Sequence, residues 1–262
     1  MKILFIGDIY GRPGRMVCST AIPFLKDKYH VDFVIANGEN AAGGFGLTPA
    51  IVNNLKSIGI DCITTGNHIW DKKEIIPYLK KGNRDVLRPL NYPEGVLGTG
   101  SYIYGKVGVI NLLGRTFVNS IIDCPFRTGL KEAINIKKKT KIIVVDFHTE
   151  TTAEKQALAF WLDGKVSAII GTHTHVQTAD ERILPEGTAF ITDAGMTGAF
   201  NSVIGARPKE AIERFIYGIP KRLQIAKGDE RFNGVVVEID EKTGMAVSIE
   251  RLNFPVEKIN RR

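Results

Sequence analysis

Short apolar runs alternate along the chain with longer segments in which apolar residues recur every three or four positions, the patterns of strands and of helices respectively. In the amino-terminal part the predicted elements are a strand over Lys2–Ile9, a helix over Arg15–Tyr29, a strand over Val31–Ala36, a helix over Pro49–Ile58 and a strand over Cys62–Thr65. The second helix has clear ends, because Thr48 is a suitable N-cap before Pro49 and Gly59 suits the carboxyl end. Strands that alternate with helices indicate an α/β fold.

The rest of the chain repeats this alternation and then becomes rich in strands. The predicted elements are a hairpin of Ser101–Tyr104 and Val107–Asn111 around Gly105-Lys106, strands over Ile142–Phe147, Val166–Ile170, Ala189–Thr192, Gly234–Ile239 and Met245–Leu252, and helices over Thr152–Leu162 and Lys209–Tyr217. No internal repeat, low-complexity tract or long linker divides the sequence, so we predict a single domain over residues 1–262. The economical architecture is a core of two sheets with helices packed outside it.

Polar side chains stand directly after the predicted strands, at five separate places. They are Asp8, Glu39, Asn40, Asn67, His68, His148, His173 and His175. Ligands of open α/β sheets bind outside the carboxyl ends of the strands, so these positions are where a site is expected. Each residue alone has an ordinary explanation: Asp8 as a turn residue, Asn67 as a helix cap, His148 as a core histidine. Their joint occurrence favours a metal site.

The number and kind of these side chains predict how many ions bind and which. Seven candidate ligands, all of these residues except His68, are too many for one four-coordinate ion with an open position, so two ions are implied. Glu39 is the central candidate for a carboxylate that bridges them, and a loop that curves at Thr174 can aim His173 and His175 at neighbouring ions. Imidazole, carboxylate and amide ligands suit iron, manganese or zinc better than magnesium or calcium.

Composition narrows the class of protein further. With 262 residues and 44% hydrophobic content the chain has enough apolar side chains for a large core, but no apolar run approaches the ~20 residues that span a membrane. Three cysteines without a CxxC pair argue against a disulfide scaffold and a thiolate zinc site, so we expect a cytoplasmic protein. The net charge of +7 suits an anionic partner but does not choose among nucleic acid, phosphate esters and membrane surfaces. We interpret the basic run Lys137–Lys139 as a solvated helix end rather than a nucleic-acid patch.

The order of the motifs resembles that of the calcineurin-like metallophosphoesterases, and within them the bacterial YmdB-type branch of cyclic nucleotide phosphodiesterases. The matching motifs are Gly7-Asp8-Ile9 with Gly11–Arg15, Asn37-Gly38-Glu39-Asn40-Ala41, Thr65-Gly66-Asn67-His68, Asp146-Phe147-His148, His173-Thr174-His175 and Thr192–Gly198. The resemblance implies a two-sheet β-sandwich core flanked by helices. Tyr10, Glu39 and Thr172 depart from the general superfamily pattern of histidine, aspartate and glycine at these places. The YmdB-type branch is similar to this chain in its glutamate and asparagine at 39 and 40.

The resemblance also implies roles for the candidate residues. Asp8, Glu39, Asn40 and His175 would hold one ion, and Glu39, Asn67, His148 and His173 the other. His68 would donate a proton to the leaving group and contact the substrate phosphate. A hydroxide between the two ions, iron being expected first and manganese or zinc next, would attack 2′,3′-cyclic nucleotides and yield 3′-nucleotides.

Several questions stay open from sequence alone. Phe45 could stack on a base, although we favour an ordinary flexible loop for Gly43–Gly46. A phosphomonoesterase or protein phosphatase would use the same metals, and the basic surface leaves a nuclease acting on RNA or DNA open. A regulatory protein that binds nucleotides or nucleic acid without turnover is the alternative that is not an enzyme. We expect a homo-oligomer with a small phosphodiester as its substrate and no membrane association.

Overall fold

A computed structural model describes residues 1–259, so the last three residues of the predicted domain lie outside the described part of the chain. Its helices and strands form an α/β protein with two sheets, as predicted. The elements are β1 (Lys2–Ile6), β2 (Asp8–Ile9), α1 (Gly11–Tyr29), β3 (Phe33–Asn37), α2 (Pro49–Ser57), β4 (Cys62–Thr64), α3 (Ile75–Lys80), β5 (Val86–Leu87), β6 (Ser101–Tyr104), β7 (Val107–Leu113), α4 (Pro125–Lys137), β8 (Ile142–His148), α5 (Thr152–Leu162), β9 (Ala168–Thr172), β10 (Arg182–Ile183), β11 (Ala189–Ile191), β12 (Met196–Ala199), α6 (Pro208–Tyr217), β13 (Glu230–Ile239), β14 (Ala246–Pro255) and a 3₁₀ turn at Val256–Lys258.

The first sheet has the strand order β2-β12-β13-β1-β3-β4-β5, with β14 paired to β13. Strands β1, β3, β4 and β5 run parallel, whereas β13 runs antiparallel to β1 and to β14. The carboxyl ends of the parallel strands therefore lie along one edge of the sheet, from which Glu39, Asn40 and Asn67 follow in the sequence.

The second sheet has the order β10-β11-β9-β8-β7-β6. Strands β7, β8, β9 and β11 run parallel, with α4 connecting β7 to β8 and α5 connecting β8 to β9. The hairpin of β6 and β7 turns through Gly105 and Lys106, as predicted, and Gly105 supplies the positive φ of 57° that such a tight turn requires. His148 ends β8 and His173 follows β9, so this sheet brings its histidines to its own carboxyl edge.

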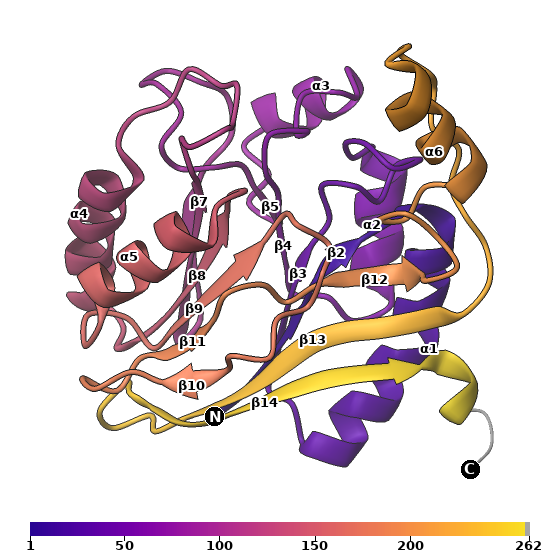
Figure 1. The fold of residues 1–262 in the computed structure, drawn as a ribbon. Helices are drawn as coiled ribbons and strands as arrows, with labels where there is room; N and C mark the ends of the chain where they lie inside the picture. Colours follow the sequence, from indigo (N-terminus) through magenta and orange to yellow (C-terminus); the bar gives the residue numbers. More distant parts are fainter. Residues whose placement is uncertain (260–262) are drawn as a thin grey trace.

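Three clusters of buried side chains hold these layers together. One cluster takes Ile3 and Phe5 of β1 together with Val144 of β8, so its side chains come from both sheets. The alternate residues of β1, Leu4 and Ile6, belong to a second cluster with residues of α1 and α2. A third cluster joins β7, β8 and β9 to α4 and α5. Figure 1 shows α1 and α2 on one outer side and α4 and α5 on the other.

The predicted strand over Lys2–Ile9 is wrong in one respect, because it breaks at Gly7 into β1 and β2. A Cβ atom on Gly7 would stand 2.1 Å from the carbonyl oxygen of Gly195, so only glycine permits the chain to pass here. The following strand β2 pairs with β12 instead of β13. The break therefore places Asp8 on a separate edge strand of the sheet, where its side chain accepts a hydrogen bond from the backbone of His173.

Three further observations concern the basic run, the cysteines and the helices. The basic run Lys137–Lys139 is exposed at the carboxyl end of α4, as its interpretation as a helix end requires. Cys18, Cys62 and Cys124 form no disulfide. Within residues 1–259, no helix combines the length and apolar character needed to cross a bilayer.

Candidate metal centre

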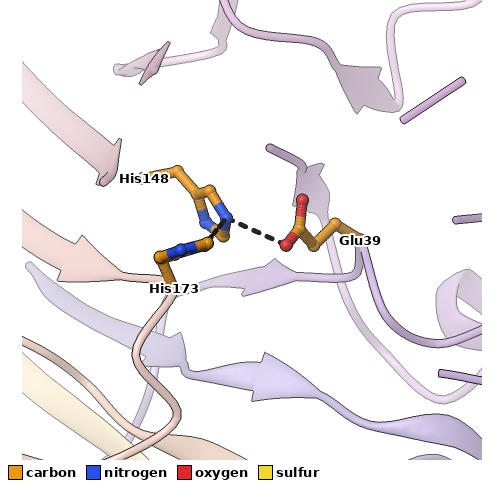
Figure 2. A group of neighbouring side chains, drawn as sticks. All are labelled: Glu39, His148 and His173. Atoms are coloured by element: carbon orange, nitrogen blue, oxygen red, sulfur yellow. Dashed lines mark hydrogen bonds and ion pairs between the residues drawn. The ribbon is translucent and has the colours of Figure 1, made fainter. Parts of the chain in front are cut away.

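The side chains of Glu39, His148 and His173 meet where the carboxyl edges of the two sheets come together. One ligand atom from each of the three lies within 4.8 Å of the others, and Figure 2 shows the two imidazoles and the carboxylate directed at one another. Glu39 follows β3 of the first sheet, whereas His148 and His173 come from β8 and the end of β9 in the second. The cluster is therefore assembled from parts of the chain that only the packing of the two sheets brings together.

The distances within this cluster are those of atoms that share a cation. Nε2 of His148 lies 2.9 Å from Oε1 of Glu39 and 3.0 Å from Nδ1 of His173. Two ligand atoms at right angles around an ion, each about 2.1 Å from it, stand about 3 Å apart. Glu39, His148 and His173 thus fit a transition-metal ion by both chemistry and spacing.

His148 is held in the tautomer that a metal ligand needs. Its Nδ1 lies 2.9 Å from Oγ1 of Thr172, and that hydroxyl donates its hydrogen to Oδ1 of Asp146 at 2.7 Å. Because the Thr172 hydrogen is engaged, its oxygen accepts the Nδ1 hydrogen of His148, and Nε2 is the nitrogen directed at Glu39 and His173. Asp146 also accepts hydrogen bonds from Asn37 and Thr64, so a buried network fixes the ring.

His173 uses its other nitrogen. Its Nε2 lies 2.9 Å from a carboxylate oxygen of Glu150, which accepts the Nε2 hydrogen. Its Nδ1 then faces His148 with a free lone pair. The backbone N–H of His173 donates to Oδ2 of Asp8 at 3.1 Å, which connects this residue to a second group of candidate ligands.

That second group consists of Asp8, Asn40 and His175. Nε2 of His175 lies 3.1 Å from the amide nitrogen of Asn40 and 3.9 Å from Oδ1 of Asp8. Its Nδ1 donates to the backbone carbonyl of Ile204 at 2.9 Å, so Nε2 is again the nitrogen that faces the site. The amide of Asn40 also donates to Oε1 of Glu39 at 3.3 Å, which places Glu39 between the two groups. We call Glu39, His148 and His173 the inner group, and Asp8, Asn40 and His175 the outer group.

Two buried oxygens at the site have no partner among the described residues. They are Oδ1 of Asp8 and Oδ1 of Asn67. A buried polar atom without a hydrogen bond costs about 1–3 kcal/mol, so such atoms mark positions where a ligand is expected. Asp8 and Asn67 were both predicted as ligands, one for each ion, and a bound cation would satisfy both oxygens.

The charges around His148 favour a cation at this point. Burial alone would lower the pKa of His148, but the carboxylates of Glu39, Asp8 and Asp146 outweigh burial and raise it to about 9. Burial and the adjacent His148 lower the pKa of His173 to about 3, which keeps its imidazole neutral. Burial alone would raise the pKa of Glu39, whereas the His148 ring lowers it to about 2. The site thus contains the ionised carboxylate of Glu39 and the neutral imidazole of His173. The surrounding carboxylates create a negative electrostatic potential that attracts a cation.

Gly66 has no side chain, and this leaves room for the side chains of the inner group to approach one another. A Cβ atom at this position would stand 2.2 Å from Cδ2 of His148 and 2.4 Å from Oε2 of Glu39. Both neighbours are fully buried, so neither has room to move away. Any residue other than glycine at position 66 would displace a candidate ligand.

The two histidines of the His-x-His motif point to different neighbours because of their backbone. His173 and His175 have φ values of 106° and 65°, so the segment is not extended and the two side chains diverge, as the predicted curve of this loop requires. Thr174 between them donates from its backbone N–H and its hydroxyl to Oδ2 of Asp193. The same carboxylate binds the ammonium of Lys155 at 2.6 Å in a fully buried ion pair. Asp193 therefore holds the strained loop in place.

His68 lies beside the cluster rather than within it. Its backbone N–H donates to Oε2 of Glu39 at 3.2 Å, and its Nδ1 lies 2.9 Å from a carboxylate oxygen of Asp71. The side chain lines a cavity of about 300 Å³ together with Asn67 and His173. The ring of Phe45 stands edge-on to the His68 ring with 5.0 Å between centroids. The structure thus brings every predicted site residue to one region, with His68 and Phe45 at its side.

Several supporting residues were not among the predicted site residues. Asp146 stands two positions before His148 on the same strand, and this period-two spacing was the available signal for it. Asp193 follows a predicted strand, so the rule that found the other residues applies to it as well. Lys155 gives no such signal, because a lysine in an amphipathic helix is ordinarily solvated.

An α/β fold whose strand ends bring imidazoles, carboxylates and amides around one point defines a metal-binding protein of the hydrolase class. The sequence model described as "YmdB-like protein" matches residues 4–252, which is nearly the whole chain. The chain belongs to the YmdB-like family.

Similar proteins agree with this assignment. The 2′,3′-cyclic-nucleotide 2′-phosphodiesterase of Bacillus subtilis (strain 168) is 48% identical over 256 residues, which cover 96% of each chain. A crystal structure of a hypothetical protein from Thermus thermophilus has a TM-score of 0.89 and 39% identity, covering 97% of this chain and 99% of that one. A crystal structure described as a novel phosphatase from Mycoplasma pneumoniae has a TM-score of 0.90 and 36% identity, covering 100% and 96%. The predicted family and the predicted phosphoesterase class are confirmed.

Proposed function

We propose that the chain hydrolyses 2′,3′-cyclic nucleotides to 3′-nucleotides at a centre of two transition-metal ions. The observation that carries this proposal is the convergence of Glu39, His148 and His173, whose ligand atoms all lie within 4.8 Å of one another beside a cavity large enough for a small molecule. The name of the Bacillus subtilis relative supplies the substrate class.

The inner and outer groups would each hold one ion, with Glu39 shared between them. Asn67 would complete the inner group, because its buried Oδ1 lacks a partner among the described residues. The donor set of nitrogen and oxygen atoms without a thiolate suits iron first, and manganese or zinc next. Bound ions would supply an activated water and neutralise charge on the phosphate.

His68 is the proposed proton donor to the departing ribose oxygen. Asp71 engages its Nδ1, so Nε2 is the atom left to face a substrate in the adjoining cavity. The hydrogen bond from the backbone of His68 to Glu39 keeps the residue at a fixed place beside the bridging carboxylate. Phe45, whose ring edge contacts His68, is the proposed residue for contact with the base.

The finer expectations about fold and assembly are proposals too. One buried cluster contains side chains from both sheets, which supports the sandwich core of calcineurin-like metallophosphoesterases in a single domain. The proposed cytoplasmic location rests on the cysteine content. On α6 and just beyond it, Ile212, Phe215, Ile216 and Ile219 form an apolar stripe that is 50–83% exposed. Tyr217, which is 68% exposed, widens this apolar face, and exposed apolar patches of this kind mark interaction sites. A homo-oligomer formed through this face is the proposed assembly.

A substrate panel tests the proposed activity. The purified protein, loaded with iron or manganese, should convert a 2′,3′-cyclic nucleotide to the 3′-nucleotide faster than it cleaves a phosphomonoester or an RNA oligonucleotide. Separation of the 2′- and 3′-products by chromatography identifies the bond that breaks. Preferred cleavage of monoesters would make the chain a phosphatase, and binding of nucleotide without turnover would remove the enzymatic proposal.

The role of His68 has its own test. His68→Ala should keep both ions and lose about 10²- to 10⁴-fold in turnover on a 2′,3′-cyclic nucleotide, because a ribose alkoxide needs a proton to leave. On a nitrophenyl phosphodiester the loss should be much smaller, since that leaving group needs none. Equal losses on both substrates would assign His68 to phosphate binding, and loss of an ion would make it a ligand.

A further inference from the structure

The cavity beside His68 has two chemically different sides. Asn67, His68, Asp71 and His173 line one side, next to the metal cluster. Phe117, Val118, Asn119 and Ser120 line the other, and none of these four carries a charge. A phosphate would bind on the first side, through its imidazoles and the proposed metal ions. The second side offers an aromatic ring, an amide and a hydroxyl, the groups that proteins use to bind a nucleobase by stacking and by hydrogen bonds at its edge.

We propose that the segment Phe117–Ser120 is the subsite for the nucleobase of the substrate, with the ring of Phe117 stacking on the base. This inference rests on the proposed cyclic nucleotide activity and adds the residues that select a nucleotide over a simpler phosphodiester. The volume of about 300 Å³ is at the lower end of small-molecule sites, which suits one mononucleotide and not a longer chain.

Neither burial nor a favourable backbone conformation explains a phenylalanine at position 117. Its side chain is 87% exposed, and its φ of 61° is in the left-handed region, which costs a non-glycine residue about 1–2 kcal/mol. A bulky residue is retained in such a conformation where the surrounding structure imposes it, and these places cluster at ligand-binding sites. The observed combination of strain, exposure and a place on the cavity wall points to a ligand that covers the ring.

Hydrogen bonds fix both ends of the segment. On one side, Glu154 accepts hydrogen bonds from the backbone N–H groups of Arg115 and Thr116 at 3.0 and 3.3 Å. On the other side, the backbone of Asp123 exchanges hydrogen bonds with Asn91 at 2.7 and 3.0 Å. Phe117 is therefore held at the mouth of the cavity by an anchored stem, which limits the entropy lost when a base stacks on it.

Phe117 is better placed for this role than Phe45. Phe45 is 39% exposed and packs edge-on against His68, so part of its ring is already covered. Phe117 lines the cavity itself and is 87% exposed, so most of its ring is accessible. Phe117 therefore supplies the stacking surface for the base, and Phe45, which packs against the imidazole of His68, contacts the base only at its edge.

The test compares a 2′,3′-cyclic nucleotide with ribose 2′,3′-cyclic phosphate, which lacks the base. Phe117→Ala should raise KM for the nucleotide about 10- to 100-fold, the range expected for the loss of one base stacked on an aromatic ring, while kcat changes little. KM for the base-free substrate should stay as in the wild type. Phe117→Trp should retain the nucleotide KM, and Phe160→Ala, which removes an exposed phenylalanine on α5, is the matched control.

Calorimetry provides a readout without turnover. A 3′-nucleotide should bind to the wild type more tightly than inorganic phosphate does, and Phe117→Ala should remove this difference while leaving the affinity for phosphate unchanged. Equal effects of Phe117→Ala on the nucleotide and on the base-free substrate would overturn the subsite, as would a wild type that does not distinguish them. A wild type that hydrolyses neither substrate would instead remove the proposed function on which this inference rests.

Discussion

His148 and His175 are both candidate metal ligands, but the structure supports them in different ways. His148 ends a strand inside a sheet, is fully buried, and is oriented by Thr172 and, through it, by Asp146. His175 lies on a loop with a positive φ and is oriented by one backbone carbonyl, that of Ile204. Ile204 is itself 54% exposed and has a φ of 46°.

This difference teaches that two ions in one centre need not be held equally. A ligand whose orientation is fixed before binding loses little entropy when the ion arrives, whereas a ligand on a loose support must be ordered at that moment. We therefore expect the ion of the inner group to bind more tightly than the ion of the outer group. Stepwise removal by a chelator should release the outer ion first.

The largest effect is expected from Glu39→Gln, because this change removes the carboxylate that both groups share. Both ions should be lost, and turnover should fall by at least about 10³-fold, since the stabilisation lost is several kcal/mol. Metal content by mass spectrometry and the rate on a 2′,3′-cyclic nucleotide are the measurements. Glu181→Gln, which alters a partly exposed carboxylate paired with Arg251, is the control. Two retained ions would end the bridging assignment.

The next effect separates the two groups. His148→Ala should empty chiefly the inner position, and His175→Ala chiefly the outer one, because each change removes one imidazole from one group. Metal content per chain should fall to about one ion in each variant. If both variants lost the same ion, or if each retained two, the division into an inner and an outer group would be wrong.

A smaller effect is expected from the residue behind His148. Asp146→Asn keeps the size of the side chain but removes the charge to which Thr172 donates, so the inner ion should bind about 10- to 100-fold more weakly. The affinity of the outer ion should not change. Asp180→Asn is a matched control, because Asp180 also accepts from a threonine, Thr192, but lies outside the metal centre. Equal weakening of both ions would show that Asp146 acts on the fold rather than on His148.

The smallest effect is expected at Ile204. Ile204→Gly relieves the positive φ and loosens the carbonyl that orients His175, without removing the carbonyl itself. The outer ion should bind at most about tenfold more weakly, at the low end of the range for outer-shell partners, and the inner ion should be unaffected. Competition with a fluorescent chelator measures both affinities. No change at the outer ion would mean that His175 is oriented by other contacts, such as the ring of Tyr10.

The strand ends were predictable from the sequence because of a general property of parallel sheets. Each apolar run predicts a strand independently of the others. In a parallel sheet, the residues that follow the strands all lie at the same edge. Asp8, Glu39 and His148 could therefore be grouped from the sequence alone, and the structure places Glu39 against His148 and Asp8 near His175 in the same region. Their roles as ligands stay predictions.

The supporting contacts could not be predicted, because they depend on the register and packing of distant strands. Thr172 contacts His148 only because β9 pairs with β8 in a register that sets these two residues opposite each other. The pairing of Lys155 with Asp193 likewise requires α5 to pack over the end of β11. The break at Gly7 depends on the approach of Gly195, which is far away in the sequence. The periodicity of apolar residues describes one segment at a time, whereas each of these contacts depends on how two distant segments pack together.

Gly66 gives the cell biologist a way to separate two kinds of role. Because a methyl group there would occupy the place where His148 and Glu39 meet, Gly66→Ala should yield a folded chain that has every ligand side chain and cannot assemble them. The exposed faces, including α6 and the segment Phe117–Ser120, would be unchanged. A strain carrying this allele would lose whatever depends on hydrolysis and keep whatever depends on the protein's presence as a binding partner. The absence of one side chain thus makes the contribution of hydrolysis testable in the cell on its own.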